Sequence, residues 1–379
     1  MVALSPRERV MRSIGHQEPD RVPLDLGGSV SSAISIGACN SLKKHLGLHT
    51  ETRVLEVTFQ MAHMEEPLAQ ALDIDTRPLY GNPPATGNHF NERGDYVDEW
   101  GITHTRPEGA HYYTNANPPL WNATIGDLES YPWPDPNDPA RVHGLRQSAE
   151  ELFASDYALV GAPDGFTRIF EQAWQLRGMD QLLVDMIVDL GFVHALFRKI
   201  TDIQKARWDA YLREAGRYVQ VVRVGDDIAM QSGPIMAPGL YRKMLKPYHK
   251  EYFAFIKERT DAGLLYHCCG GVWDLLEDFI EIGVDILNPV QVSADGMDTA
   301  RLKEQFGKRI AFWGAVDTQR VLPQGTPEEV RLEVRKRITD LGSGGGYVLC
   351  PVHNLQPDVP PENVLAMYDE ARRFGRYPL

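Results

Sequence analysis

Residues 263–289 read GLLYHCCGGVWDLLEDFIEIGVDILNP, and this stretch decides the fold class. A short apolar run (263–267) leads through a glycine pair into a segment whose apolar residues recur at helical spacing (273–282), and a second apolar run (284–289) follows. The strand interiors do not alternate between apolar and polar residues, so both faces of the sheet are expected to be covered. The pattern is typical of a parallel α/β sheet packed between helices.

The same kind of apolar run recurs along the chain, separated by helical segments such as 238–259. A Ser-Pro-Arg-Glu start at residues 5–8 predicts a further helix near the beginning. We predict strands at eight places: 21–28, 73–78, 158–162, 219–224, 263–267, 284–289, 309–314 and 346–350. Eight strand–helix units close into a barrel, so the sequence predicts a (β/α)8 TIM barrel. Because no internal repeat or low-complexity linker is present, residues 1–379 are expected to form a single domain.

Residues 81–139 interrupt this alternation. They are rich in Pro, Asn, Gly and aromatic residues, and we predict an irregular insertion with a small hairpin near 91–105. Insertions of this kind serve as lids, as binding loops or as contacts with a partner.

Composition excludes several classes of protein. The net charge is −13, from 39 basic and 52 acidic residues, and no compact Lys/Arg cluster is present, so nucleic-acid binding is not expected. The N-terminus lacks the apolar core of a signal peptide, and no apolar run approaches the roughly 18–20 residues that span a bilayer, so no membrane association is expected. The four cysteines show no disulfide pattern, which predicts a reducing, cytoplasmic location.

Polar residues stand at the ends of five consecutive predicted strands, from the fourth to the eighth. An apolar strand has no structural need to end in such residues, and the active sites of barrel enzymes lie at these ends. The residues concerned are Asp226, Asp227, His267, Cys269, Asn288, Gln291, Asp317, Cys350 and His353. We therefore predict one polar site built from several strand ends.

His267 and Cys269 are the most specific pair in this set. Residues i and i+2 of an extended segment point the same way, so both side chains can reach one ion. Imidazole and thiolate together suit zinc, and a third ligand is expected from the eighth strand end, either His353 or Cys350. Three protein ligands leave a coordination position open for substrate. The alternative is a histidine at a strand end beside a small buried cysteine, which is the role we assign to Cys268.

Further residues are candidates for catalysis or substrate binding. Either Asp226 or Asp227 could cap the following turn while the other faces the site, and both are counted as catalytic candidates with Asn288 and Gln291. The substrate-binding candidates are Arg168, Arg177 and Asp317. The two arginines could hold a substrate carboxylate or pair with surface acids.

The order and spacing of several motifs resemble the uroporphyrinogen decarboxylase superfamily, in the branch that includes corrinoid-dependent methyltransferases. The resemblance covers almost the whole chain, and the matching segments are Pro6–Val10, Glu18–Pro23, Gly225–Asp227, Pro247–His249, His267–Gly270, Ile282–Pro289, Gly314–Gln319 and Pro351–Pro360. The resemblance implies a (β/α)8 barrel.

It also implies specific site residues. The methyltransferase branch holds zinc with a His-x-Cys motif, which His267 and Cys269 match, and with a distant Cys, whose place is taken here by His353, with Cys350 three residues earlier. The decarboxylase members use no metal and grip the porphyrin with an N-terminal Arg-rich motif. The matching stretch here, Leu26–Ser32, has no Arg, which disfavours decarboxylation.

Our hypothesis is that a zinc-dependent methyltransferase moves a methyl group between a small methoxy, amine or thiol compound and a corrinoid (cobalamin) on a separate protein. Zinc with one sulfur and two imidazole ligands is more electrophilic than zinc with two sulfurs, which favours demethylation of a donor. The alternatives are a metal-independent tetrapyrrole decarboxylase, in which Asp226 or Asp227 would bind the pyrrole NH groups, and a non-catalytic barrel that binds a corrinoid protein. The substrate, the direction of transfer and formation of a homodimer stay open.

Overall fold

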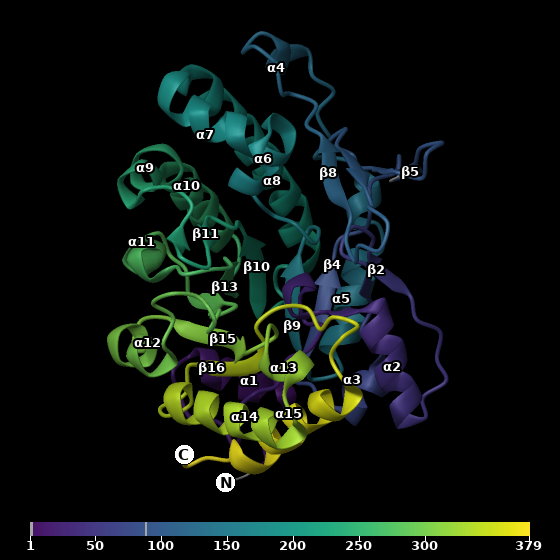
Figure 1. Cartoon of the computed structure of the whole chain (residues 1–379), viewed down its shortest axis with the longest axis vertical. Coiled ribbons are helices and arrows are strands. Elements are labelled where there is room, and N and C mark those ends of the chain that lie inside the picture. Colours follow the sequence, from purple (N-terminus) through teal and green to yellow (C-terminus); the bar gives the residue numbers. More distant parts are fainter. Residues whose placement is uncertain (1–2, 88) are drawn as a thin grey trace.

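Seven parallel strands form the central sheet of the computed structural model, which describes residues 3–87 and 89–379 (Figure 1). They are β4 (Thr76–Tyr80), β9 (Ala158–Ala162), β10 (Val221–Gly225), β13 (Gly263–His267), β14 (Ile286–Asn288), β15 (Ala311–Val316) and β16 (Tyr347–Pro351). Each strand pairs with the next one in this order. All carboxyl ends therefore lie at the same end of the curled sheet.

Residues 23–25 lie between β16 and β4 as an eighth, very short strand-like segment that closes the sheet into a barrel. This segment is called the closing segment below. On one side, Leu24 forms a parallel bridge with Leu349, whose N–H donates to the Pro23 carbonyl at 2.9 Å. On the other side, the Asp75 N–H donates to the Leu24 carbonyl at 2.9 Å. The predicted TIM barrel is confirmed. The first predicted strand (21–28) shrinks to this short contact because Pro23 has no N–H to donate and Gly27 turns the chain with φ of 76°.

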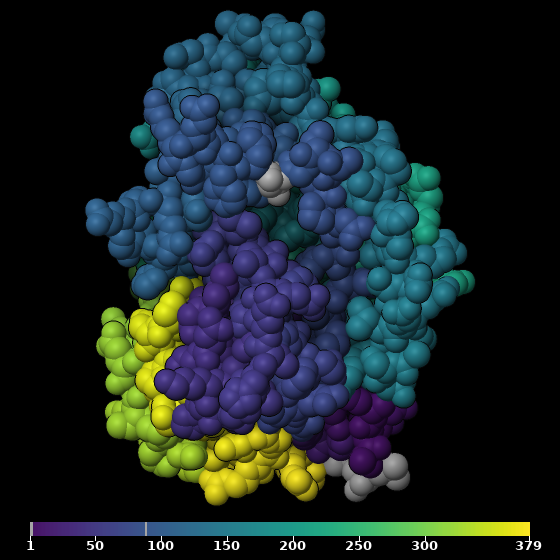
Figure 2. All heavy atoms as spheres, turned by 90° about the vertical axis from the view of Figure 1, so that its right-hand side faces the viewer, coloured from purple at the N-terminus to yellow at the C-terminus, as the bar shows by residue number. Residues whose placement is uncertain are grey.

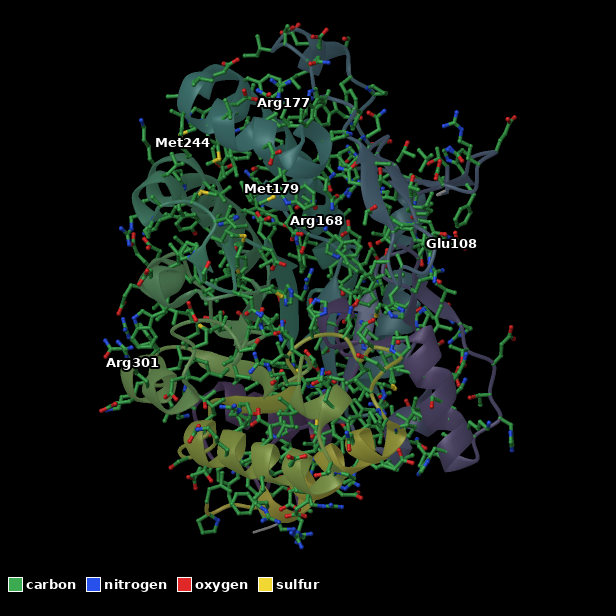
Figure 3. All side chains as sticks on the ribbon, in the orientation of Figure 1. Glu108, Arg168, Arg177, Met179, Met244 and Arg301 are labelled. Carbon is green, nitrogen blue, oxygen red and sulfur yellow. The ribbon has the colours of Figure 1, made fainter. Side chains whose placement is uncertain are left out.

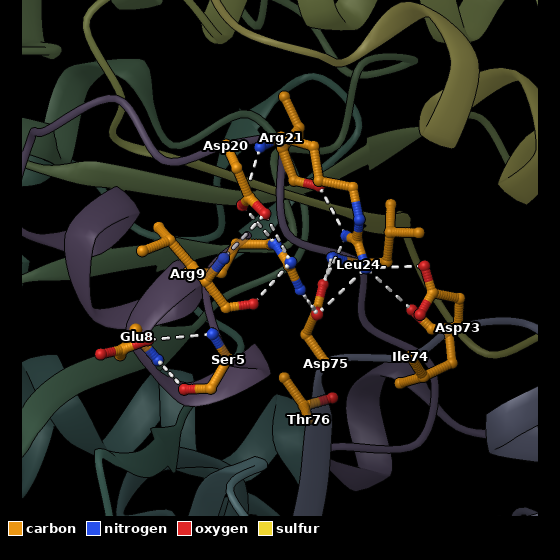
Figure 4. Close-up of polar contacts among 12 residues, drawn as sticks. Ser5, Glu8, Arg9, Asp20, Arg21, Leu24, Asp73, Ile74, Asp75 and Thr76 are labelled. Carbon is orange, nitrogen blue, oxygen red and sulfur yellow. Dashed lines mark hydrogen bonds and ion pairs between the residues drawn. The ribbon is translucent and has the colours of Figure 1, made fainter. Parts of the chain in front are cut away.

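A buried charge cluster holds the closing segment in place at the N-terminal end of the barrel (Figure 4). Asp75 accepts from the Leu24 N–H at 2.7 Å and pairs with both Arg9 at 2.6 Å and Arg21 at 2.7 Å. Asp20 pairs with the other edge of the Arg9 guanidinium at 2.7 Å. The carboxylate of Asp75 thus connects helix α1, the closing segment and the residues before β4.

Helices surround the strands (Figure 1). The α-helices are α1 (Pro6–Ile14), α2 (Ile36–Leu46), α3 (Glu66–Ala71), α4 (Asp127–Ser130), α5 (Leu145–Phe153), α6 (Phe170–Arg177), α7 (Met179–Val188), α8 (Leu190–Ala215), α9 (Pro238–Met244), α10 (Lys246–Lys257), α11 (Leu276–Glu281), α12 (Thr299–Phe306), α13 (Val321–Gln324), α14 (Pro327–Leu341) and α15 (Pro361–Phe374). Short 3-10 turns are η1 (Val30–Ser32), η2 (Pro139–Val142) and η3 (Trp273–Leu275). No helix in the described part of the chain is long and apolar enough to cross a membrane.

Two predicted helices show how local sequence sets the boundaries. Helix α1 begins with the predicted capping box, in which Ser5 and Glu8 satisfy each other's backbone N–H groups. The segment 238–259 was predicted as one helix but forms two, α9 and α10, which meet at Leu245. Pro247 lies in the first turn of α10, where its missing N–H costs nothing.

The core has two parts, one inside the barrel and one between the strands and the helices. The inner cluster contains Val10, Ala158, Val160, Val221, Leu265, Ile286, Ala311, Trp313, Val348 and Cys350. Burial on both faces explains why the strands carry apolar residues at successive positions.

The remaining strands are short. β1 (Ile34–Ser35), β3 (Met61–Ala62) and β2 (Val54–Glu56) form an antiparallel sheet, and β11 (Ala229–Met230) pairs with β12 (Gly233–Pro234). Within the predicted insertion, β5 (His89–Phe90), β6 (Tyr96–Val97), β7 (Thr103–Thr105) and β8 (Thr114–Asn117) form a four-stranded antiparallel sheet. The insertion is thus more regular than predicted.

Candidate functional site

A cavity lies at the carboxyl ends of the strands, where barrel enzymes carry their active sites. Its volume is about 440 Å³, part of it open to solvent. It is lined by Val30, Ser31, Glu56, Phe59, Met61, Phe166, Arg168, Glu171, Arg223, Asp227, His267, His353 and Asn354. Figure 2 shows a hollow between the purple N-terminal segments and the blue insertion, with teal atoms at its floor.

His267, Cys269 and His353 come together at this cavity. One nitrogen of each histidine and the Cys269 Sγ all lie within 4.8 Å of one another, and His267 Nε2 is 3.5 Å from Cys269 Sγ. His267 is the last residue of β13, Cys269 follows two residues later, and His353 follows β16. Cys350 does not join this group, because it lies on β16 and is buried in the inner core with Trp313 and Val348.

Hydrogen bonds determine which nitrogen of His267 is available. Asn288 donates through Nδ2 to the Trp313 carbonyl at 3.0 Å, which leaves its Oδ1 to face His267 Nδ1 at 2.5 Å. Because that oxygen can only accept, Nδ1 carries the proton and Nε2 keeps its lone pair on the side of Cys269. Burial lowers the pKa of His267 to about 3, with the Arg223 charge acting in the same direction, so the imidazole is neutral.

The Cys269 loop is held by neighbouring side chains. Asp227 accepts from the Cys269 N–H at 2.7 Å and lies 3.9 Å from His267 Nε2. Gln291 accepts from the Gly270 N–H at 2.8 Å, and Gly270 has φ of 99°, which favours glycine. Burial raises the pKa of the Cys269 thiol. Asp227 therefore faces the cavity, whereas Gln291 stabilises the loop behind it.

Asp226 lies behind the site. Its carboxylate accepts from three backbone N–H groups at the start of α6, those of Ile169, Phe170 and Glu171, at 2.6–3.0 Å. His249 Nε2 lies 2.9 Å from the same carboxylate. This is the capping arrangement that the sequence left open for one of the two aspartates.

The candidate substrate-binding residues separate in space. Arg168 lines the cavity just before α6, whereas Arg177 lies at the far end of this helix (Figure 3). Arg177 pairs with Asp185 at 2.7 Å and donates to the carbonyls of the insertion, so it anchors that segment. Asp317 accepts from the Gln319 N–H at 2.7 Å and caps the turn before α13. Of these three residues, the cavity includes Arg168 alone.

Glu171 and Arg223 line the cavity, and neither was among the site residues predicted from the sequence. Burial raises the pKa of Glu171 to about 7, with Asp227 and Asp226 acting in the same direction and Arg168 against it. Arg223 is 4% exposed and stands in an otherwise apolar strand. A charged residue within such a strand was the available signal for Arg223; Glu171, on a helix, gave none.

Similarity to a known protein family covers most of the chain. The model of the uroporphyrinogen decarboxylase (URO-D) family matches residues 123–374, which is more than half of the chain. The chain belongs to the uroporphyrinogen decarboxylase family.

Individual relatives within the uroporphyrinogen decarboxylase family are distant. A uroporphyrinogen decarboxylase from Burkholderia thailandensis is 29% identical over 192 residues, covering 48% of each chain. One from Actinobacillus pleuropneumoniae is 23% identical over 259 residues, covering 66% of this chain and 68% of that protein. The chain thus spans about half the length of the first of these curated relatives.

A solved structure described as a methyltransferase from Methanosarcina mazei has the same fold. Its TM-score is 0.66 at 18% identity, and the match covers 98% of this chain and 99% of that chain. At this identity the likeness concerns the fold.

Proposed function

We propose that this chain is a zinc-dependent methyltransferase that moves a methyl group between a small substrate and a corrinoid carried by a separate protein. The observation that supports it is the approach of His267, Cys269 and His353 to one another beside the cavity, which the two histidines line. Membership of the family and a nearly full-length fold match to a protein described as a methyltransferase add support. The single domain and the cytoplasmic location stay predictions.

The donor set fits zinc. One sulfur and two imidazole nitrogens are ligands that zinc prefers, and three protein ligands leave a position for substrate. The Asn288 hydrogen bond fixes His267 in the tautomer that a metal ligand needs. Burial lowers the pKa of His353 to about 3, so this second imidazole is neutral too.

When bound, zinc would act as a Lewis acid on the heteroatom of the substrate, and the corrinoid would supply the cobalt that exchanges the methyl group. The residues of the chain position these partners. Asp227 holds the Cys269 backbone, Asn288 orients His267, and Phe59 and Phe166 wall the cavity.

Replacement of Asn288 by alanine is expected to weaken zinc binding by about 10–100-fold, because His267 loses the partner that fixes its ring. Competition with a zinc chelator measures this affinity. Asn82→Ala is the matched control, because Asn82 is exposed and bonds to carbonyls outside the cavity. Equal affinities of Asn288→Ala and wild type would rule out the orienting role.

One pair of assays tests the proposal against its rivals. The purified protein is incubated with methoxy or methylamine compounds and reduced cob(I)alamin, with thiols and methylcobalamin, and separately with uroporphyrinogen. Zinc-dependent methyl transfer without release of CO2 supports the proposal. Release of CO2 that persists after zinc removal makes the chain a decarboxylase, and corrinoid-protein binding without either reaction makes it a non-catalytic barrel.

A further inference from the structure

Arg223 lies on the inner face of the barrel, directly below the metal-ligand candidates. In the register of β10 and β13, Gly225 is opposite His267 and Arg223 is opposite Leu265, which belongs to the inner core. Residues i and i+2 share a face, so Arg223, Gly225 and His267 all point inward. The backbone of Arg223 thus lies one layer of side chains deeper in the barrel than His267, which lines the cavity.

Gly225 lets the guanidinium reach the cavity. A Cβ at position 225 would lie 2.7 Å from Arg223 Nη2 and 3.0 Å from its Cζ, which is too close. The guanidinium therefore occupies the space of a side chain at position 225, at the level of His267. In the sequence Val-Arg-Val-Gly (222–225), the glycine two residues after Arg223 has no side chain, and the guanidinium of Arg223 fills the space that is left.

Arg223 has no hydrogen-bonded counter-charge among the described residues, although Glu171 and Asp227 lie near enough to act on its charge. Its Nη1 donates to the Gly165 carbonyl at 2.8 Å and its Nη2 to Ser31 Oγ at 2.7 Å, and both acceptors are neutral. Its Nε is buried without a hydrogen-bond partner. Among the carboxylates of residues 3–87 and 89–379, none forms an ion pair with Arg223. A buried and unpaired charge is costly, and it persists where a ligand compensates it.

The rest of the cavity limits what this ligand can be. Of the two arginines that line the cavity, Arg168 is paired with Glu171 at 3.4 Å, whereas Arg223 forms no ion pair. Glu171, Asp227 and Glu56 also line the cavity and repel negative charge, so a group with two negative charges is disfavoured more than a single carboxylate at Arg223. Phe59 and Phe166, with ring centroids 5.7 Å apart, offer an apolar wall for a flat body.

We propose that Arg223 binds the carboxylate of the substrate, so that the substrate class is a small, flat carboxylic acid. This inference rests on the proposed function, because it places the acid in the same cavity as the metal-ligand candidates. The carboxylate is held at Arg223, and the heteroatom that gives or takes the methyl group faces His267, Cys269 and His353. A planar guanidinium fork suits a carboxylate.

Calorimetric titration with benzoate, acetate and the uncharged analogue benzamide tests the proposal on the purified protein. We expect saturable binding of benzoate, at least about tenfold tighter than that of benzamide, since a hydrogen bond to a charged group is the difference. Acetate, which lacks the ring, is expected to bind more weakly than benzoate. Equal affinities for benzoate and benzamide would overturn the proposal.

Arg223→Gln is expected to weaken benzoate binding by about tenfold or more and to leave benzamide binding unchanged. Arg223→Lys keeps the charge and is expected to retain part of the benzoate affinity. The control Arg301→Gln, at an exposed position, should bind benzoate like wild type. Thermal unfolding monitors folding of each variant. Unchanged benzoate affinity in a folded Arg223→Gln protein would also overturn the proposal.

Repeating the titration after zinc removal separates this proposal from the proposed function. Benzoate binding that needs Arg223 but not zinc supports the carboxylate site whether or not methyl transfer is found. Methyl transfer together with equal binding of benzoate and benzamide would leave the methyltransferase standing and overturn the substrate class.

Discussion

Asp75→Ala is expected to lower the free energy of unfolding by about 3–5 kcal/mol, because Arg9 and Arg21 lose the buried carboxylate that they share and keep only the more exposed Asp20 and Asp73. Asp75 is 1% exposed and pairs with both Arg9 and Arg21. Its carboxylate also accepts a hydrogen bond from the Leu24 N–H of the closing segment. The substitution therefore removes the side-chain contacts of Asp75 at the closure of the barrel, while the backbone bonds of Pro23 and Leu24 remain.

Urea denaturation followed by circular dichroism measures this loss. The matched control is Asp202→Ala, because Asp202 is exposed on α8 and pairs with Arg198 at 3.6 Å. A surface pair of this kind contributes less than about 1 kcal/mol. If the two variants unfold at the same urea concentration, the charge cluster does not hold the barrel closed.

The largest effect on activity is expected for His267→Ala. Loss of a side chain that only orients a metal ligand costs about 10–100-fold, so loss of the ligand itself should lower the rate of methyl transfer by more than about 100-fold. The rate is measured with reduced cob(I)alamin and a methyl donor at saturating zinc. His111→Ala, at an exposed position, serves as control. Activity within a few-fold of wild type would remove His267 from the mechanism.

Much of the fold could be predicted from the sequence, because parallel strands that are buried on both faces appear as short runs of successive apolar residues. The runs at 158–162 and 263–267 were predicted with their observed bounds. The first strand was overestimated because apolar residues report burial but not hydrogen bonding. Leu24 is buried like a strand residue, yet its neighbours Pro23 and Gly27 limit pairing to a single bridge.

The metal-ligand candidates illustrate what spacing can and cannot predict. His267 and Cys269 share a face because the chain is extended there, so their approach follows from the sequence. The choice between Cys350 and His353 depended on where β16 ends, and sequence patterns locate strand ends poorly. Cys350 is still within the strand and points into the barrel core.

The polar residues at strand ends were harder to interpret for a chemical reason. Capping a helix or a turn requires the same carboxylates and amides as catalysis, and sequence alone does not distinguish the two uses. Asp226 and Asp317 accept backbone N–H groups, whereas Asp227 does so while also facing the cavity. Only the folded chain shows which oxygen atoms face the cavity.

The zinc content of the wild type and of two single variants is the most direct test of whether His267, Cys269 and His353 hold a metal ion. We expect about one zinc per chain in the wild-type protein, retained in Cys350→Ala and lost in a folded His353→Ala. Wild-type protein without zinc, or zinc retained in His353→Ala and lost in Cys350→Ala, would contradict this expectation.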